Sequence, residues 1–237
     1  MQAIVPAAGE GTRLRPLTDD RPKGLVEVAG DPILTHVFEA LRSLGVDDIV
    51  VVVGYRGDDI VDYYGDRFRD VSLTYARQEA RLGLGHAVLA AEGSVSGDVV
   101  VWNGDNVGAA NPSELVARHR EHDAAATFLV EEVSRERATA GAAFVLDDGA
   151  PVGVVEKPDD PPSRLVPRGV AAFSPRIFDA LRRVSPSARG EYELADAVDL
   201  LLDEGAGVEL VALEGWLTNV NTPGDVEAAS RRLEPVG

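Results

Sequence analysis

Apolar residues along the chain fall into two patterns that alternate. Short, almost wholly apolar runs occupy residues 3–5, 48–53 and 98–102, which is typical of strands buried on both faces of a sheet. Residues 33–44 instead carry apolar side chains three and four positions apart, the spacing of a helix with one buried face. This alternation predicts an α/β fold built on a doubly wound, Rossmann-like sheet that is mixed but mainly parallel.

The same two patterns predict the remaining elements. Further strands are expected at residues 71–75, 124–130, 140–146, 152–155, 169–173 and 208–213, and helices at 58–64, 111–119, 175–181, 190–202 and 225–233. Asp147-Asp148-Gly149 is expected to turn a hairpin between two of the strands. His119 and His122 lie among charged residues, so we expect both on the solvated surface.

A glycine-rich loop follows the first strand directly. Gly9 and Gly11 would let the backbone approach a ligand closely and turn its N–H groups toward phosphate. Arg13 and Lys23 bracket this loop with positive charge, and the combination suits a triphosphate. An ordinary strand-to-helix turn is the alternative. The loop lacks the Gly-Lys-Ser/Thr of a P-loop, and Leu14 stands where a dinucleotide fingerprint needs its third glycine.

The charge balance changes which partners are plausible. With 40 acidic and 23 basic residues, the formal net charge of −17 makes nucleic acid an unfavourable partner. Lys23 and Lys157 are the two lysines, and arginine supplies every other basic side chain. The acidic, lysine-poor composition favours adaptation to high salt, or alternatively a codon bias toward arginine. Two lysines retained against that bias suggest positions that need a compact ammonium group.

Other features of the composition exclude cysteine chemistry and argue against a membrane or secreted protein. The chain has no cysteine, which excludes disulfides, thiol nucleophiles and cysteine-bound zinc. No apolar run approaches the ~20 residues of a membrane helix, and the first residues lack the pattern of a signal peptide. We therefore expect a cytoplasmic protein without membrane contact.

Two further residues are candidates for ligand contacts. Gln78 follows a strand and offers an amide donor and acceptor that suit the edge of a base. Asp105 follows the apolar strand 98–102, at the edge where open α/β sheets bind ligands, and its carboxylate suits Mg²⁺. A lone aspartate at such a place is often a helix cap, although Asn111 or Ser113 could cap the next helix instead.

The stretch GEGTRLRPLTDDRPKGLVEVAGDPIL resembles the opening motif of the sugar-1-phosphate nucleotidyltransferases. Within that family it looks closest to the enzymes that join UTP or dTTP to glucose 1-phosphate. The resemblance implies one GT-A-like nucleotidyltransferase domain over residues 1–237, without a β-helix domain. Its nucleotide-binding part would cover about residues 1–110, and its sugar-binding part about 111–237.

The resemblance also implies roles for individual residues. Arg13, Lys23 and Lys157 would be catalytic, and Mg²⁺ would bind Asp105 with Asn219 or Asn221. The expected nucleotide-binding residues are Ala7, Ala8, Gly9, Gly11, Thr12, Gln78 and Gly83, and the expected sugar-binding residues are Gly141, Glu156, Lys157 and Gly169. The acids of residues 190–194 would either support the sugar site or only begin a helix.

The chain departs from the family pattern at three places. Leu84 replaces the usual threonine of the base-reading segment, and Pro167-Arg168 stands near the usual asparagine of the sugar site. Asn219 replaces the usual second metal-binding aspartate. The three departures concern, in this order, recognition of the base, contacts to the sugar hydroxyls and binding of the metal ion.

The expected reaction transfers a nucleotidyl group from a nucleoside triphosphate to a sugar 1-phosphate, giving a nucleotide sugar and pyrophosphate. UTP and glucose 1-phosphate are the preferred substrates, with dTTP as the alternative. A non-catalytic homologue that binds nucleotide sugar, and a cytidylyl- or phosphocholine-type transferase, are the other hypotheses. Whether the protein forms a homo-oligomer stays open at this stage.

Overall fold

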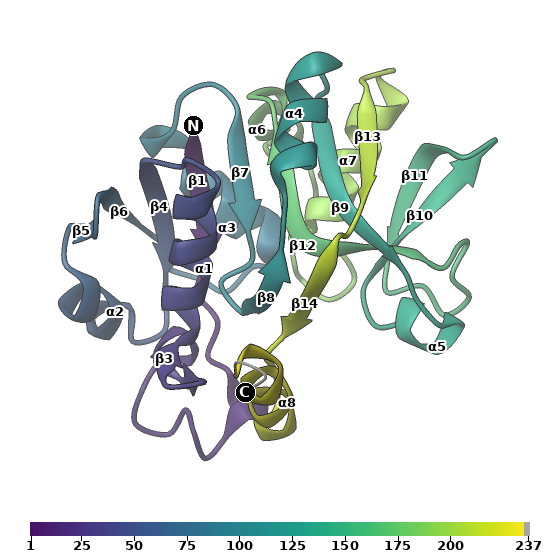
Figure 1. Cartoon of the computed structure of the whole chain (residues 1–237). Coiled ribbons are helices and arrows are strands. Elements are labelled where there is room, and N and C mark those ends of the chain that lie inside the picture. Colours follow the sequence, from purple (N-terminus) through teal and green to yellow (C-terminus); the bar gives the residue numbers. More distant parts are fainter. Residues whose placement is uncertain (235–237) are drawn as a thin grey trace.

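A central sheet of eight strands organises the chain in the computed structural model, which describes residues 1–234. Strand β1 (Gln2–Pro6) lies between β4 (Asp48–Val53) and β7 (Val99–Trp102) and runs parallel to both. Their apolar side chains are almost wholly buried, as expected of strands covered on both faces. The carboxyl ends of β1 and β7 therefore meet at one edge of the sheet, where the glycine loop and Asp105 begin (Figure 1).

The rest of the sheet is mixed. On one side lie β6 (Val71–Arg77), parallel to β4, and the short edge strand β5 (Arg67–Phe68), antiparallel to β6. On the other side β12 (Leu165–Phe173) runs antiparallel to both β7 and β9 (Ala126–Glu132), and β13 (Val208–Ala212) runs parallel to β9. The strand order β13-β9-β12-β7-β1-β4-β6-β5 confirms the predicted mixed, mainly parallel α/β sheet.

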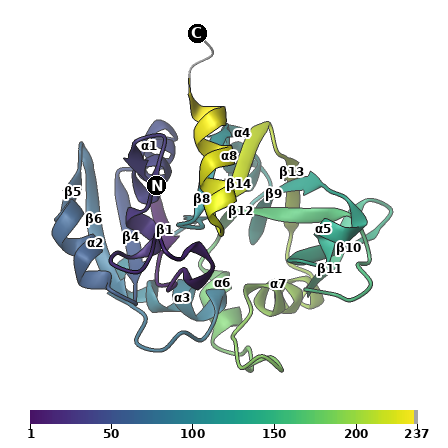
Figure 2. The ribbon, with the colours of Figure 1, turned by 90° about the horizontal axis from the view of Figure 1, so that it is seen from below.

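Helices cover both faces of this sheet (Figure 2). One core contains side chains from α1 (Ile33–Ser43), α2 (Gly57–Tyr64) and α4 (Ser113–Glu121). The opposite core contains side chains from α3 (Leu84–Ala90), α6 (Arg176–Leu181) and α7 (Leu194–Asp203). Two helices lie outside these layers, α5 (Arg135–Ala138) and α8 (Pro223–Leu233).

Three two-stranded ribbons complete the fold. β10 (Ala142–Asp147) and β11 (Ala150–Glu156) form the hairpin that the sequence predicted, and β2 (Glu27–Val28) pairs with β3 (Asp31–Pro32). The third ribbon joins β8 (Asn106–Ala110) to β14 (Gly215–Asn219), neither of which the sequence predicted. This ribbon returns a late segment of the chain to Asp105, whose carbonyl oxygen accepts a 2.8 Å hydrogen bond from the amide of Val220.

The prediction that His119 lies on the surface was wrong. His119 is 1% exposed and lies 3.0 Å from the hydroxyl of Thr127 on β9. It is one helical turn after the buried Leu115, so it shares the face of α4 that packs on the sheet. His122 is exposed, as expected.

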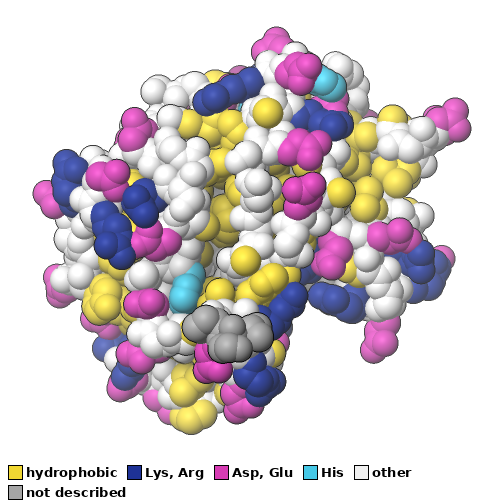
Figure 3. Space-filling view, viewed as in Figure 1, with side chains coloured by type: hydrophobic (Ala, Val, Ile, Leu, Met, Phe, Trp, Pro, Cys, Tyr) yellow, Lys and Arg dark blue, Asp and Glu magenta, His cyan; other side chains and the backbone are white. Residues whose placement is uncertain are grey.

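The outer surface carries charges of both signs. In Figure 3, acidic and basic side chains lie interspersed over the visible face instead of in separate patches. Within residues 1–234, no helix has the length and apolar character needed to cross a membrane.

Candidate active site

The glycine loop, residues 7–13, connects β1 to a 3₁₀ turn at Thr12–Leu14 and folds back on Lys23. Gly11 has a left-handed φ of 67°, and a β-carbon there would lie 3.0 Å from the β-carbon of Lys23. The buried hydroxyl of Thr18 donates a 2.9 Å hydrogen bond to the carbonyl oxygen of Gly11, which fixes this conformation. Glycine at position 11 therefore lets the loop and the lysine lie against each other.

Four residues that are distant in sequence converge beside this loop. The Lys23 ammonium donates to Asp105 Oδ2 at 2.6 Å and to Asn221 Oδ1 at 2.9 Å. Arg13 Nη2 donates to the same Asn221 oxygen at 3.0 Å. The structure thus brings together both cations of the early motif, the predicted metal-binding carboxylate and one of the two candidate amides.

The packing of two central strands sets the position of Asp105. The amide of Gly104 donates a 3.0 Å hydrogen bond to the carbonyl oxygen of Pro6 at the end of β1. A β-carbon at residue 104 would lie 2.6 Å from that oxygen, so a larger residue would push the turn away. A glycine before the aspartate is therefore what lets the carboxylate lie close to β1.

Two neighbouring cavities open at this edge of the sheet. The smaller, of about 250 Å³, is lined by the glycine loop and by Lys23 and Asp105. The larger, of about 350 Å³, lies against β11, β12 and the start of α7. Leu84 and Asn103 line both cavities, so a ligand could extend from one into the other.

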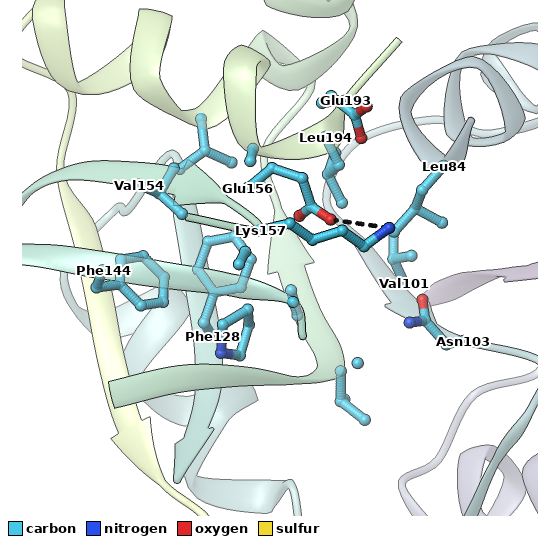
Figure 4. Close-up of a pocket in the computed structure, with 18 of the residues that line it drawn as sticks. Leu84, Val101, Asn103, Phe128, Phe144, Val154, Glu156, Lys157, Glu193 and Leu194 are labelled. Carbon is cyan, nitrogen blue, oxygen red and sulfur yellow. Dashed lines mark ion pairs between the residues drawn. The ribbon is translucent and has the colours of Figure 1, made fainter. Parts of the chain in front are cut away.

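The larger cavity is lined by both polar and apolar side chains (Figure 4). Glu156 and Lys157, at the end of β11, face it as an ion pair with 3.7 Å between Lys157 Nζ and Glu156 Oε1. Burial raises the pKa of the Glu156 carboxyl above its usual value of 4.5; the charge of Lys157 opposes this rise and that of Glu193 adds to it. Phe128 and Phe144 are among the apolar residues that line this cavity.

The predicted sugar-binding glycines both line this larger cavity. Gly169 has a left-handed φ of 73°, and a β-carbon there would lie 2.6 Å from the Asn106 amide nitrogen. Gly141 has open space where a side chain would be, and its carbonyl oxygen accepts a 2.9 Å hydrogen bond from the amide of Lys157. The structure therefore places Gly141, Glu156, Lys157 and Gly169 around one space.

Gln78 and Gly83 lie next to each other near the glycine loop. The Gln78 side chain is 6% exposed, and its amide nitrogen donates to the carbonyl oxygen of Gly83 at 3.0 Å and lies 3.0 Å from His86 Nδ1. It lines a third cavity, of about 280 Å³, together with Gly54, which packs against Ala8 of the loop. Both residues are thus close to the loop, and Gly83 also adjoins Leu84 and Glu191, which line the larger cavity together with Lys157.

Asn219 and Asn221 differ in their surroundings. Asn219 lines the larger cavity, whereas the side-chain oxygen of Asn221 accepts from Arg13 and Lys23. Both amides nevertheless lie in the short segment that the β8–β14 ribbon brings back to Asp105.

The oxygen atoms around Lys23 fit a cation. Its ammonium group stands between Asp105 Oδ2 and Asn221 Oδ1, so the two oxygens already attract positive charge. Residues 1–234 hold no cluster of three acidic or histidine ligands that would form a complete metal site. One carboxylate with amide oxygens matches the way Mg²⁺ binds when a nucleotide's phosphates supply further ligands.

Asn103 was missed as a site residue at the larger cavity, and Glu193 is one of the acids of residues 190–194 for which a sugar-site role was left open. Asn103 lies between the cavities, and its place at the end of β7, directly before Gly104-Asp105, could have indicated this. Glu193 is buried at the cavity and accepts hydrogen bonds from Ser187 Oγ at 2.9 Å and Arg189 Nη2 at 2.7 Å. Ser187 and Arg189 lie six and four residues before Glu193, so both contacts are local in the sequence.

Comparison with known proteins gives consistent results. Residues 2–221 match the family described as "Nucleotidyl transferase". The chain is 47% identical to the UTP–glucose-1-phosphate uridylyltransferase AglF of Haloferax volcanii, over 99% of this chain and 97% of that protein. It is 37% identical to the glucose-1-phosphate thymidylyltransferase of Streptomyces antibioticus, over 98% of this chain and 66% of that protein.

A solved structure shows the same fold over the whole chain. The crystal structure of a putative glucose-1-phosphate thymidylyltransferase from Bacillus anthracis, in complex with a sucrose, superposes with a TM-score of 0.89 at 25% identity. The alignment covers 100% of this chain and 98% of that one.

Proposed function

The chain belongs to the nucleotidyl transferase family, and we propose that it transfers a uridylyl group from UTP to glucose 1-phosphate. One observation carries this proposal: Arg13, Lys23 and Asp105 meet beside the glycine loop, and the cavity next to them presents Glu156 and Lys157. An oxygen of the sugar phosphate would form a bond to the α-phosphorus of UTP while the bond to the β-phosphate breaks. The products would be a uridine diphosphate sugar and pyrophosphate.

The nucleotide would lie along the glycine loop. Arg13 would hold the β- and γ-phosphates and the leaving pyrophosphate, and Lys23 would bridge the reacting phosphates. Backbone N–H groups of the loop would contact the phosphates, because the open space at Gly9 permits close approach. The residues assigned to the nucleotide are Ala7, Ala8, Gly9, Gly11, Thr12, Gln78 and Gly83, the last two reading the base.

The sugar phosphate would occupy the larger cavity. The Glu156 carboxylate would accept hydrogen bonds from sugar hydroxyls, with Gly141 and Gly169 contacting the sugar through their backbones. Lys157 would hold the attacking phosphate. A phosphate monoester has its second pKa near 6, so it is largely ionised at neutral pH and needs no general base.

Catalysis would then depend on positioning and on charge stabilisation. Asp105, with Asn219 or Asn221, would hold Mg²⁺. When bound, the metal would neutralise charge on the phosphates. We place the reaction in the cytoplasm, where nucleoside triphosphates and sugar phosphates are made.

A second candidate reaction uses dTTP. Gln78 and the backbone at Gly83 would recognise uracil and thymine alike, and the thymidylyltransferase of Streptomyces antibioticus is 37% identical to the chain. The choice of UTP rests on the higher identity, 47%, to the uridylyltransferase.

Measuring pyrophosphate release with five nucleoside triphosphates and a panel of sugar 1-phosphates tests the proposal. We expect UTP with glucose 1-phosphate to give the highest kcat/KM, with dTTP next. Release with CTP and a non-sugar phosphate alone would overturn the proposal. Binding of nucleotide sugar without any release would favour the non-catalytic homologue.

A further inference from the structure

A single carboxylate oxygen holds the loop between β14 and α8. Asp225 Oδ2 accepts hydrogen bonds from the backbone amides of Asn221 at 3.0 Å and Thr222 at 2.8 Å, and from the hydroxyl of Thr222 at 2.9 Å. Asp225 lies in the first turn of α8 and does not itself contact Arg13, Lys23 or Asp105 among the contacts described above. Its effect on the site must therefore pass through Asn221.

Asn221 links this carboxylate to the two cations. Its backbone amide is held by Asp225, while its side-chain oxygen accepts from both Arg13 Nη2 and Lys23 Nζ. The two positive side chains repel each other, so a shared acceptor helps to keep them together. Because the Asn221 amide is neutral, this contact does not offset the positive charge of either side chain.

The helix that carries Asp225 is anchored to the glycine-loop region. Ala229 of α8 is fully buried in a small apolar cluster with Leu14, and Val226 packs against the same cluster. Leu14 directly follows Arg13, so the start of α8 has a fixed position relative to the cations. Asp225 can therefore set the position of Asn221 without moving itself.

We propose that Asp225 is a positioning residue for nucleotide binding, which acts through Asn221 to hold Arg13 and Lys23 where the phosphates bind. The inference rests on the proposed function. The simpler role for Asp225 is one half of a capping box, in which its carboxylate accepts from the amide of Thr222 while Thr222 Oγ1 accepts a 3.3 Å hydrogen bond from the amide of Asp225. A cap alone would stabilise α8 without affecting the nucleotide.

A comparison of three variants separates the two roles. Asp225→Ala removes the carboxylate that holds Asn221 and the Thr222 amide but keeps the amide that donates to Thr222 Oγ1. Asp225→Asn keeps an acceptor oxygen without its charge. Thr222→Val removes the hydroxyl half of the capping box while leaving Asp225 to hold Asn221. UTP binding is measured by isothermal titration calorimetry in EDTA, so that the protein's own cations are the readout. Thermal unfolding and the KM for glucose 1-phosphate are measured on the same samples.

We expect Asp225→Ala to weaken UTP binding roughly tenfold, as for loss of a charged hydrogen-bond acceptor, and Asp225→Asn to weaken it less. Thr222→Val loses both hydrogen bonds of the hydroxyl and should lower the melting temperature. It should bind UTP within about twofold of wild type, because the amide of Asn221 still donates to Asp225 Oδ2. The KM for glucose 1-phosphate should stay unchanged in all three, since Glu156 and Lys157 lie in the other cavity.

Equal UTP affinity in Asp225→Ala and Thr222→Val would overturn the inference while leaving the proposed function intact, because wild type would still bind UTP and release pyrophosphate. If Asp225→Ala does not fold, Asp225→Asn against Thr222→Val decides in the same way. Failure of wild type to bind any nucleoside triphosphate would overturn both the inference and the proposed function.

Discussion

Replacing Lys23 with methionine tests the centre of the proposed mechanism. The substitution keeps most of the apolar stem and removes the ammonium that contacts Asp105 and Asn221. Loss of one donor aimed at the reacting phosphates should lower turnover about a hundred- to a thousandfold, equivalent to roughly 2.7–4 kcal/mol.

The effect on stability should be much smaller. At 2.6 Å and an effective dielectric constant near 20, the attraction between Lys23 and Asp105 is about 6 kcal/mol before desolvation is counted. The side chains are 14% and 27% exposed, so water reaches the carboxylate when the lysine is lost. We take the net cost as about 1–2 kcal/mol, which for a chain of this size lowers the melting temperature by about 2–8 °C.

The assay is steady-state pyrophosphate release with UTP and glucose 1-phosphate, together with thermal unfolding followed by circular dichroism. Arg21→Met is the matched control: it removes a cation two residues away that is 46% exposed and pairs with Asp20. The control should change turnover less than twofold, as expected for a surface ion pair of under about 1 kcal/mol. A folded Lys23→Met variant with turnover within about threefold of wild type would refute the reasoning.

Three further predictions follow from burial and packing. Glu156→Gln should raise the melting temperature at pH 7, because burial raises the pKa of the Glu156 carboxyl and its ionised form therefore destabilises the folded state. This gain in melting temperature should vanish as the pH falls toward 4.5. The KM for glucose 1-phosphate should rise roughly tenfold in the same variant. In wild type, the free energy of unfolding should fall as the pH drops below 6.5, because burial lowers the pKa of His119 and its protonation favours the unfolded chain. His119→Gln should make this fall smaller, as measured by urea unfolding at several pH values. Gly9→Ala should leave stability unchanged but weaken UTP binding, whereas Gly104→Ala should lower stability as well, because its β-carbon would lie 2.6 Å from the carbonyl oxygen of Pro6.

Each of these has an outcome that contradicts it. A Glu156→Gln variant less stable than wild type at pH 7 would show that its ion pairs outweigh its burial. An unchanged pH slope in His119→Gln would assign the acid sensitivity to other groups. UTP binding of Gly9→Ala equal to that of wild type would remove the loop backbone from the phosphate site.

The place of the glycine loop and of Asp105 at the ligand-binding edge of the sheet could be predicted from sequence, because each directly follows an apolar run. The structure adds that the two runs pair directly, as β1 and β7. Lys23 and Lys157 could be singled out because arginine supplies every other basic side chain. Local patterns of this kind fix which edge of the sheet carries the site.

The contacts of Asn221 could not be predicted in the same way. They depend on β14 pairing with β8, two short strands whose apolar patterns are weak and which are more than 100 residues apart. The burial of His119 depends likewise on its partner Thr127, which lies on a different element. Such features arise from tertiary pairing, which a single sequence does not encode as a local period.

The β8–β14 ribbon also affects when the protein can become active. All strands of the central sheet are translated before residues 215–221, so a nascent chain on the ribosome could assemble the sheet and still lack Asn219 and Asn221. The proposed chemistry would begin only after residues 215–221 had emerged and paired with β8, so a nascent chain with a complete central sheet would still lack nucleotide turnover.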